Sequence, residues 1–522
     1  MADLKKRDSW GSRIGIIMAV AGSAIGLGNF LRFPAKAAAN GGGAFMIPYF
    51  ISLFLLGVPL MWIEWTLGRY GGGFGHGTAP GIFHSLLQKN RFIKYFGVIG
   101  IFGPLVIFIY YLFIESWTLA YSFFALTGKY TALMDQNALH SFLLGFQGLE
   151  KNQYFSGTQT AYIFFLITFF LNILVIYHGI KGGIEKLCKL AIPLLFCFGL
   201  VLIVRVITLG APDPSKPDWN ILAGFGFLWN PDFSALKSAK VWLEAAGQIF
   251  FTLSVGIGVI LTYASYLKKA DDVVLSGLTA ATTNEIAEVI FGASIIIPAA
   301  FVFFGPVDIK SIAQSGVFNL SFVTMPLVLN KLPLSSLFGF LWFFLLFTAG
   351  ITSSLSLAQP AVAFLEDEFN ISRRRAVSIF GIVSFMLCQP AVFFLGRGVV
   401  NELDFWGGTF FLVVFATIET VLFVWVFGMD RAWDEIHKGA QLSIPGIYKF
   451  IIKYITPLFL FVILGMWFIQ EWLPIILMKD VSGADKPFVL GTRLILLLLL
   501  ATLTILVKIA WSRKKRKGNS RI

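Results

Sequence analysis

The chain is poor in charged residues for its length. Asp, Glu, Lys and Arg make up 13% of its 522 residues, against about a quarter in a typical soluble protein, and 57% of the residues are hydrophobic. Apolar runs of about 20 residues recur from one end of the sequence to the other, as membrane-spanning helices require. These runs lack the residue-by-residue alternation of barrel strands. We therefore expect an all-α polytopic membrane protein.

Cysteine and histidine are also scarce, which argues against a metal centre and against enzymatic chemistry. The three cysteines show no metal-ligand spacing, and no two of the five histidines stand at metal-binding spacing within one apolar run. The segment Gly26–Asn29 follows no predicted strand and lacks the spacing of a phosphate-binding loop. We expect no enzyme activity. We also expect no nucleic-acid partner, because a net charge of +13 on a membrane protein reflects its topology.

The apolar runs predict twelve spans, and the basic residues predict their orientation. The spans are centred at about residues 24, 58, 108, 168, 198, 253, 290, 350, 383, 415, 460 and 500. An even number of spans places both termini on the same side of the membrane. Lys and Arg favour that side by roughly two to one, and the basic segment that begins at Arg513 lies there as well. We expect a multi-pass protein of the inner (plasma) membrane with both termini in the cytoplasm.

A glycine motif occurs once in the first predicted span and once in the sixth. Ala24–Gly28 reads AIGLG and Ser254–Gly258 reads SVGIG, so each of the two spans carries Gly-x-Gly near its middle. For a single copy, glycines that only allow close helix packing are the alternative explanation. Two copies in register, each beside polar residues, favour two broken helices, which in a transporter mark the binding site.

The separation of the two motifs predicts an inverted repeat. The sixth span lies an odd number of spans after the first, so the second copy enters the membrane from the opposite side. We expect one transmembrane domain, residues 1–522, in which spans 1–5 (about residues 12–209) and spans 6–10 (about 238–428) are the two halves. Spans 11 and 12, over about residues 447–512, are additions to this plan.

Broken helices would expose backbone groups that suit a carboxylate and a small cation. Freed amides at the N-terminus of a half-helix carry partial positive charge, whereas freed carbonyls and a C-terminus attract a hard cation such as Na⁺. The neutral side-chain oxygens near the predicted midplane are those of Asn29, Thr252, Ser254, Asn284, Thr352 and Ser353. For the hydroxyls, bonding back to the preceding helical turn is the alternative.

Charged residues at membrane depth are candidates for function, because they are costly there. Glu288 lies one helical turn after Asn284 and so shares its face. Arg32 and Asp404 stand at the outer ends of spans 1 and 10, where they either close a lid as an ion pair or mark where two helices meet water. The other acids at or near membrane depth are Glu64, Glu115, Glu244 and Glu419.

Several motifs resemble those of one known family. The segments GNFLRFP, NGGGAF, GQIFFTLSVGIG, LTAATTNEIAE, AGITSSLSLAQP and FLEDE resemble the neurotransmitter:sodium symporter family, most closely its prokaryotic amino-acid branch. The resemblance extends over nearly the whole chain, with the motifs in the order and at the spacing of the family. It implies twelve transmembrane helices in a LeuT-type 5+5 inverted repeat, with helices 1 and 6 broken.

The resemblance also implies two sodium sites and a substrate pocket. The first sodium site would use Ala24, Asn29, Thr252 and Asn284 together with the substrate carboxylate, and the second would use Gly22, Ile25, Ala349, Thr352 and Ser353. The pocket would be lined by Ala24, Gly26, Leu27, Gly28, Ile107, Tyr111, Phe251, Thr252, Ser254, Ile257, Ser353 and Leu357. Within it, the amides of Leu27 and Gly28 and the hydroxyl of Tyr111 would hold the carboxylate.

Two gates are implied in the same way. Phe251 and Tyr111 would form a thin outer lid over the pocket. The residues around this lid would be Arg32, Asp404 and Gln248. The cytoplasmic gate would be formed by Arg7, Asp367, Tyr266 and Gln359.

Three features of the implied site refine the expected substrate and ions. Monoamine carriers of the family have an aspartate where this chain has Gly26, so the substrate here should bring its own carboxylate. Glu288 stands where chloride-dependent members have a serine beside chloride, and its carboxylate would supply the negative charge instead. Its implied neighbours are Tyr49, Gln248, Thr252 and Asn284. The part of the pocket that would hold the substrate side chain is apolar, and Ile257 stands where family members often have an aromatic residue.

Together these features predict sodium-coupled symport of a neutral, hydrophobic L-amino acid into the cell by alternating access, without chloride. The partners are the amino-acid substrate, sodium ions and the lipid bilayer. One alternative is a proton-coupled amino-acid carrier of the same fold, which would not need both oxygen-rich sites. A second alternative is a membrane sensor that binds amino acids without transporting them. Glu244, in the outer half of the sixth span, is unexpected for the family and has no explanation in the sequence.

Overall fold

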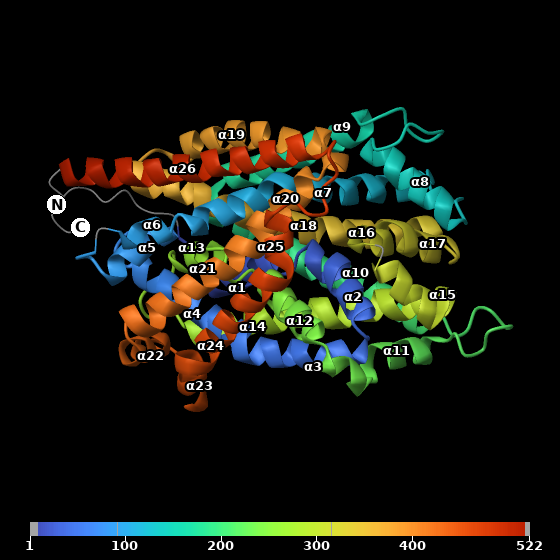
Figure 1. Cartoon of the computed structure of the whole chain (residues 1–522), viewed down its shortest axis with the longest axis horizontal. Coiled ribbons are helices and arrows are strands. Elements are labelled where there is room, and N and C mark those ends of the chain that lie inside the picture. The colour runs from blue at the N-terminus through green and yellow to red at the C-terminus, as the bar shows by residue number, and fades with distance from the viewer. Residues whose placement is uncertain (1–8, 91, 315, 517–522) are drawn as a thin grey trace.

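The computed structural model describes residues 9–90, 92–314 and 316–516. Within these ranges the chain is built of helices, and its one strand-like feature is an isolated antiparallel bridge between Gly42 and Pro231. Most of the long helices run along the long axis of the molecule (Figure 1). The predicted all-α polytopic architecture is confirmed.

Ten segments of the described chain are long and apolar enough to cross a membrane. They are Gly43–Gly72, Ile93–Leu126, Gln159–Tyr177, Ile180–Ile207, Val273–Gln314, Ser335–Phe369, Arg373–Phe393, Val399–Val426, Ile447–Gln470 and Lys486–Arg516. A further pair, α1 (Arg13–Ala24) and α2 (Leu27–Ala39), is bent by 45° at a short break. This pair is the first predicted span.

The sixth predicted span is broken as well. It consists of α12 (Ala239–Thr252) and α13 (Val259–Ala264), which are separated by residues 253–258. In this segment Ser254, Gly256 and Gly258 have φ values of 54°, 77° and 81°, a left-handed conformation that glycine adopts without strain. With this pair included, each of the twelve predicted spans has a helical counterpart in the described chain.

The remaining helices follow in chain order. The first group is α3 (Gly43–Ser52), α4 (Val58–Gly72), α5 (Ala79–Leu86), α6 (Ile93–Phe96), α7 (Ile99–Leu126), α8 (Gln136–Gln147), α9 (Gln159–Tyr177), α10 (Glu185–Ile207) and α11 (Ile221–Trp229). The second group is α14 (Val273–Glu285), α15 (Ser294–Gln314), α16 (Val317–Asn319), α17 (Met325–Asn330), α18 (Ser335–Phe369), α19 (Arg373–Phe393), α20 (Val399–Leu403), α21 (Phe411–Val421), α22 (Met429–His437), α23 (Ile447–Phe450), α24 (Thr456–Trp467), α25 (Leu473–Ile476) and α26 (Lys486–Arg516).

Short π-helical and 3₁₀ segments join several of these helices. The π-helical segments are η1 (Leu53–Gly57), η2 (Ile180–Ile184), η4 (Ile286–Ala293), η5 (Leu320–Thr324), η7 (Asp404–Phe410), η8 (Leu422–Val426), η9 (Ile451–Ile455) and η10 (Phe468–Trp472). The 3₁₀ segments are η3 (Phe233–Lys237) and η6 (Leu395–Arg397). Within α15 the helix is kinked at Gly305, where φ is 74°.

The two broken helices are enclosed by continuous ones. The half-helix α1 packs against α10, α14 and α18, whereas α2 packs against α15 and η4. In the second broken span, α12 packs against α3 and α13 against α4, and α7 and α18 lie along each other. By contrast, α9, α19 and α26 lie along one side of the molecule (Figure 1). The breaks therefore lie inside protein, where unpaired backbone groups are tolerated.

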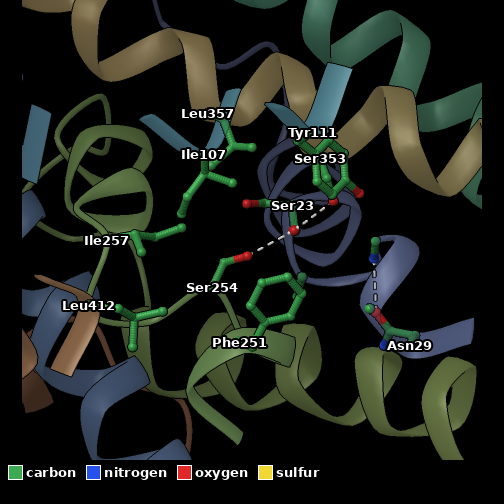
Figure 2. Close-up of a pocket in the computed structure, with 13 residues that line it drawn as sticks. Ser23, Asn29, Ile107, Tyr111, Phe251, Ser254, Ile257, Ser353, Leu357 and Leu412 are labelled. Carbon is green, nitrogen blue, oxygen red and sulfur yellow. Dashed lines mark hydrogen bonds between the residues drawn. The ribbon is translucent and has the colours of Figure 1, made fainter. Parts of the chain in front are cut away.

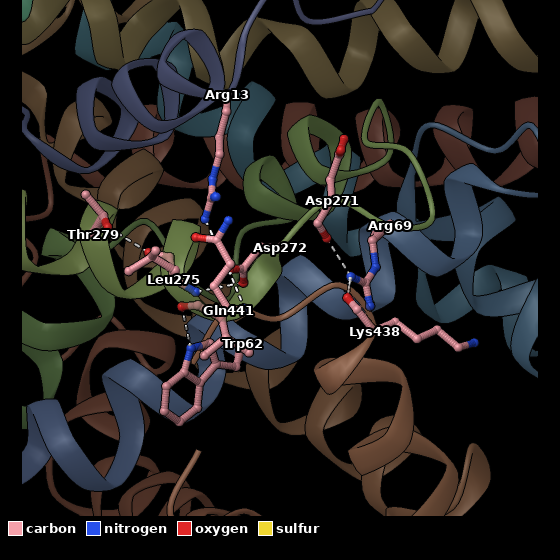
Figure 3. Close-up of polar contacts among 10 residues, drawn as sticks. Arg13, Trp62, Arg69, Asp271, Asp272, Leu275, Thr279, Lys438 and Gln441 are labelled. Atoms are coloured by element: carbon pink, nitrogen blue, oxygen red, sulfur yellow. Dashed lines mark hydrogen bonds and ion pairs between the residues drawn. The ribbon is translucent and has the colours of Figure 1, made fainter. Parts of the chain in front are cut away.

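Polar contacts fix the segment between α13 and α14 (Figure 3). The Asp272 side chain accepts a hydrogen bond from the Leu275 amide at 3.0 Å, which caps α14, and it also pairs with Arg13 at 3.1 Å. The buried Arg69 side chain of α4 donates to the backbone carbonyls of Asp271 and Lys438, each at 2.7 Å. The start of α14 is thus connected to α1, to α4 and to the segment after α22.

Candidate functional site

A pocket lies between the two broken helices (Figure 2). The cavity between the lining side chains has a volume of about 40 Å³ in this conformation. Its lining residues are Ser23, Ala24, Gly26, Gly28, Asn29, Ile107, Tyr111, Phe251, Ser254, Ile257, Ser353, Leu357 and Leu412. All the residues predicted to line the pocket are in this set except Leu27 and Thr252.

The C-terminal end of α1 directs its last carbonyl groups at two serine hydroxyls. Ser353 Oγ of α18 lies 2.9 Å from the Ser23 carbonyl oxygen and 3.3 Å from that of Gly22. Ser254 Oγ, from the second break, donates to the Ser23 carbonyl at 2.9 Å. The last carbonyls of a helix lack partners within it, so they are available to a hydroxyl or to a cation. The two breaks therefore meet at the end of α1.

The N-terminal end of α2 offers amide groups on the other side of the first break. The Leu27 amide donates to the Tyr111 hydroxyl oxygen at 2.9 Å, and the Gly26 amide donates to Asn29 Oδ1 at 2.9 Å. A Cβ atom at Gly26 would lie 2.7 Å from Ser353 Oγ and 2.9 Å from the Tyr111 hydroxyl oxygen, so a side chain there would displace one of these hydroxyls. Helix amides beside a hydroxyl form a cradle with the partial positive charge that a carboxylate requires.

The polar side chains predicted for the first sodium site converge beside this cradle. Asn29 Nδ2 lies 2.8 Å from Asn284 Oδ1 and 3.2 Å from Thr252 Oγ1, and Asn284 Nδ2 donates to Thr252 Oγ1 at 2.9 Å. None of the three is more than 1% exposed. Ala24, the remaining predicted residue, ends α1 and lines the pocket. Neutral oxygens from three helices are thus gathered in one buried cluster, and such ligands suit a hard cation.

The residues predicted for the second sodium site lie where α1 meets α18. A Cβ atom at Gly22 would lie 3.0 Å from Thr352 Cβ, so the backbone of α1 approaches α18 closely. Thr352 Oγ1 lies 3.1 Å from the Ala349 carbonyl oxygen in its own helix, whereas Ser353 Oγ reaches across to α1. Ile25 directly follows α1 and is fully buried. The Thr352 hydroxyl therefore bonds back to its own helix, which is the alternative expected for such hydroxyls, whereas the Ser353 hydroxyl bonds across to α1.

Glu288 is fully buried, and three donors hold its carboxylate. Oε2 lies 2.6 Å from the Tyr49 hydroxyl and 2.5 Å from Thr252 Oγ1, and Oε1 accepts a hydrogen bond from Gln248 Nε2. Asn284, the fourth neighbour implied by the resemblance, is linked to the carboxylate through the Thr252 hydroxyl, to which it donates a hydrogen bond. The carboxylate is thus one hydrogen bond away from the cluster predicted to hold sodium, where a negative charge favours a cation.

The predicted outer-gate residues lie above the pocket. The Arg32 guanidinium carbon lies 4.7 Å from the centroid of the Phe251 ring, a cation–π contact. Asp404 accepts a hydrogen bond from the Tyr110 hydroxyl at 2.6 Å. Within the described structure no ion pair joins Arg32 to Asp404 in this conformation, and Gln248 is bonded to Glu288.

The predicted cytoplasmic-gate residues are partly described. Gln359 Nε2 donates to the Tyr266 hydroxyl at 3.1 Å, and Arg373 Nη2 donates to Gln359 Oε1 at 3.0 Å. Asp367 lies in the last turn of α18. Arg7, the predicted partner of Asp367, lies outside the described residues.

The far end of the pocket is apolar. Ile107, Ile257, Leu357 and Leu412 project into it from α7, from the second break, from α18 and from α21 (Figure 2). All four are at most 5% exposed, and the described residues that line the pocket include no charged side chain. The pocket thus has one end that suits a carboxylate and another that suits an uncharged, apolar group.

Three residues at the site were not indicated by the sequence. Leu412 lines the apolar end, but nothing distinguishes it from the other leucines of its span. Ser23 lines the polar end, and its hydroxyl oxygen lies 2.7 Å from Ser356 Oγ. Glu285 Oε2 lies 2.8 Å from the Tyr49 hydroxyl. Its position one turn before Glu288 was the signal that could have indicated it.

Comparison with known proteins places this geometry in context. The model of a family described as the sodium:neurotransmitter symporter family matches residues 7–209 and 135–507. Among solved structures, the crystal structure of MhsT in complex with L-phenylalanine matches with a TM-score of 0.74 and 28% identity, over 88% of this chain and 99% of that chain.

Curated relatives match over most of their length. An uncharacterized sodium-dependent transporter of Methanocaldococcus jannaschii is 31% identical over 467 residues, which cover 87% of this chain and 89% of that protein. The uncharacterized sodium-dependent transporter YhdH of Bacillus subtilis is 31% identical, over 80% of this chain and 85% of its own. The sodium-dependent nutrient amino acid transporter 1 of Drosophila willistoni is 26% identical, over 88% and 77% respectively.

Proposed function

Since the chain belongs to the sodium:neurotransmitter symporter family, we propose that it carries a neutral, hydrophobic L-amino acid into the cell together with sodium, by alternating access and without chloride. Sodium-coupled amino-acid transport in general is supported by relatives named sodium-dependent transporters and by the amino acid bound to MhsT. The same names support the expectation that the chain is not an enzyme. We further propose that both termini are cytoplasmic and that spans 1–5 and 6–10 are inverted repeats.

One observation carries the proposal: the carboxylate cradle and the first predicted sodium site share a helix. The Leu27 amide and the Tyr111 hydroxyl form the cradle at the start of α2, and Asn29, in the same turn, contacts Thr252 and Asn284. A substrate carboxylate in the cradle would complete the oxygen ligands of a sodium ion in this cluster. Binding of either would then strengthen binding of the other, as reciprocal linkage requires.

The pocket supports the proposed class of substrate. Gly26 provides no side-chain acid, so we expect the negative charge that completes the first sodium site to come with the substrate. At the other end, Ile107, Ile257 and Leu357 leave a charged side chain without a partner, and burial of an unpaired charge is costly. A neutral, hydrophobic amino acid meets both conditions.

The proposed ions follow from two further contacts. The carboxylate of Glu288 already provides a negative charge one hydrogen bond away from the first site, so chloride is not needed there. At the second site, a sodium ion between Gly22 and Thr352 would connect α1 to α18. Occupied sites would then permit the outer gate to close and spans 1, 2, 6 and 7 to rock against the rest.

Uptake into proteoliposomes tests this proposal. Labelled leucine, phenylalanine, alanine, lysine, glutamate and dopamine are offered with an inward sodium gradient, with sodium replaced by choline, and with chloride replaced by gluconate. We expect uptake of the neutral amino acids only, abolished in choline and unchanged in gluconate. Uptake in choline that follows a proton gradient would instead identify a proton-coupled carrier. Binding without any uptake would identify a sensor.

A further inference from the structure

An ion pair joins the outer parts of the two outer half-helices. Lys36 Nζ of α2 lies 2.5 Å from Glu244 Oε2 of α12. The two side chains are 27% and 16% exposed, so the pair is only partly screened by solvent. Glu244 is the acid that has no explanation in the sequence.

This pair is the outermost of several contacts along α2 and α12. Nearest the pocket, Phe251 packs against Gly28, where a Cβ atom would lie 2.5 Å from Phe251 Cε1. Next, the Arg32 guanidinium carbon lies 4.7 Å from the centroid of the Phe251 ring. Lys36 lies four residues beyond Arg32, on the same face of α2 and about 6 Å further along its axis. The Lys36–Glu244 pair is therefore about one helical turn outside Arg32.

Arg32 consequently has three acids in its surroundings. It interacts electrostatically with the buried Glu288, whose carboxylate is already held by three donors, and the other two are Asp404 and Glu244. Asp404 belongs to the tenth span, whereas Glu244 belongs to α12, which packs directly against α2. Without Lys36, the carboxylate of Glu244 would be free to attract the guanidinium group one turn away. A bond between Arg32 and Glu244 would join α2 to α12, which belong to the same moving set of spans, and would leave Asp404 without its gate partner.

We infer that Lys36 is a positioning residue that occupies Glu244 and so keeps Arg32 available for closing the outer gate onto Asp404. This inference rests on the proposed function, in which Arg32 and Asp404 form that gate. Lys240, one turn outside Glu244 on α12, is exposed and forms no ion pair within the described structure.

Four variants test the inference by uptake and by equilibrium binding. Lys36→Ala should lower the maximal rate of sodium-driven uptake about five-fold, which corresponds to about 1 kcal/mol, the upper range for a partly exposed competing pair. The dissociation constant of the substrate in sodium should change less than about two-fold, because closure rather than binding is impaired. Adding Glu244→Ala to Lys36→Ala should restore the wild-type rate, because the competitor for Arg32 is removed.

The other two of these four variants serve as controls. Lys240→Ala, which removes a lysine one turn from Glu244, should leave the rate unchanged. Glu244→Ala alone should also keep the wild-type rate, so the inference remains testable if Lys36→Ala does not fold. The inference is overturned if the double variant is as slow as Lys36→Ala, since the pair would then only brace α2 against α12. It is also overturned if Glu244→Ala alone lowers the maximal uptake rate. The same holds if Lys36→Ala keeps the wild-type rate. A wild-type protein without transport would refute the proposed function instead.

Discussion

Replacing Glu288 by serine should make transport depend on chloride. A sodium ion at the first proposed site would lie about 2.4 Å from Thr252 Oγ1, as oxygen ligands of hard cations do. That hydroxyl oxygen lies 2.5 Å from Glu288 Oε2. Cation and carboxylate would thus be at most about 5 Å apart, and at an effective dielectric constant of about 20 they attract each other by at least about 3 kcal/mol. Loss of the carboxylate should therefore weaken sodium binding about 100-fold.

The assay compares sodium dependence in two anions. Labelled amino-acid uptake into proteoliposomes is measured against sodium concentration, in chloride and in gluconate. For the wild type we expect the same half-saturating sodium concentration in both anions. For Glu288→Ser in gluconate, that concentration should rise about 100-fold. In chloride most of the increase should disappear, because the shorter serine side chain leaves space for the anion beside Tyr49 and Gln248.

A neighbouring acid provides the matched control. The carboxylate of Glu285 contacts Tyr49 and Asn284, but within the described structure it contacts neither Thr252 nor Gln248. Glu285→Ser should therefore not create a chloride requirement. The reasoning is refuted if Glu288→Ser shows the same sodium dependence in chloride and in gluconate, or if the wild type itself needs chloride.

Three further variants probe the pocket and the second sodium site. Gly26→Asp should lower the initial uptake rate of amino acids at least about ten-fold, because its side chain would displace the Ser353 or the Tyr111 hydroxyl; uptake within two-fold of wild type would contradict this. Ile257→Phe should raise the KM of large hydrophobic amino acids about ten-fold in competition assays and that of alanine much less, and equal shifts would be evidence against the assigned pocket end. Ser353→Ala should raise the half-saturating sodium concentration about ten-fold, because it removes the α18 hydroxyl that contacts both the Ser23 and the Gly22 carbonyl; an unchanged value would exclude it as a ligand.

The broken helices were predictable because their cause is local. The motifs at residues 24–28 and 254–258 place glycines inside apolar runs, and the structure breaks the helix at both. The same holds for the long spans, since about 20 apolar residues suffice to indicate one. The sequence alone could not show that Asn29, Thr252 and Asn284 meet, because their helices are distant in the chain. That expectation depended on the family resemblance.

Other contacts depend on packing that no local pattern encodes. Leu412 enters the pocket only because α21 packs beside the second break, and its sequence surroundings are uniformly apolar. Lys36 and Glu244 lie 208 residues apart in the chain (244 − 36), and their pairing depends on how α2 and α12 align. Glu244 is conspicuous in the sequence as an acid near membrane depth, but nothing in spacing or periodicity indicates that Lys36 is its partner.

The absence of a side chain at Gly26 bears directly on coupling. An acid fixed at this position would give the first sodium site its negative charge permanently, and sodium would then bind there whether or not substrate was present. A Cβ at Gly26 would displace the Ser353 or the Tyr111 hydroxyl, so an acid there would disturb the groups proposed to bind the substrate. If the last ligand arrives only as the carboxylate of the substrate, the occupied site requires both species, and linkage makes each raise the affinity of the other equally. Glu288, which contacts Thr252 but lies outside the pocket, favours the cation without replacing that ligand. Under the proposed function, coupling would therefore depend on the absence of an acid at position 26 together with a fixed charge, Glu288, behind the site.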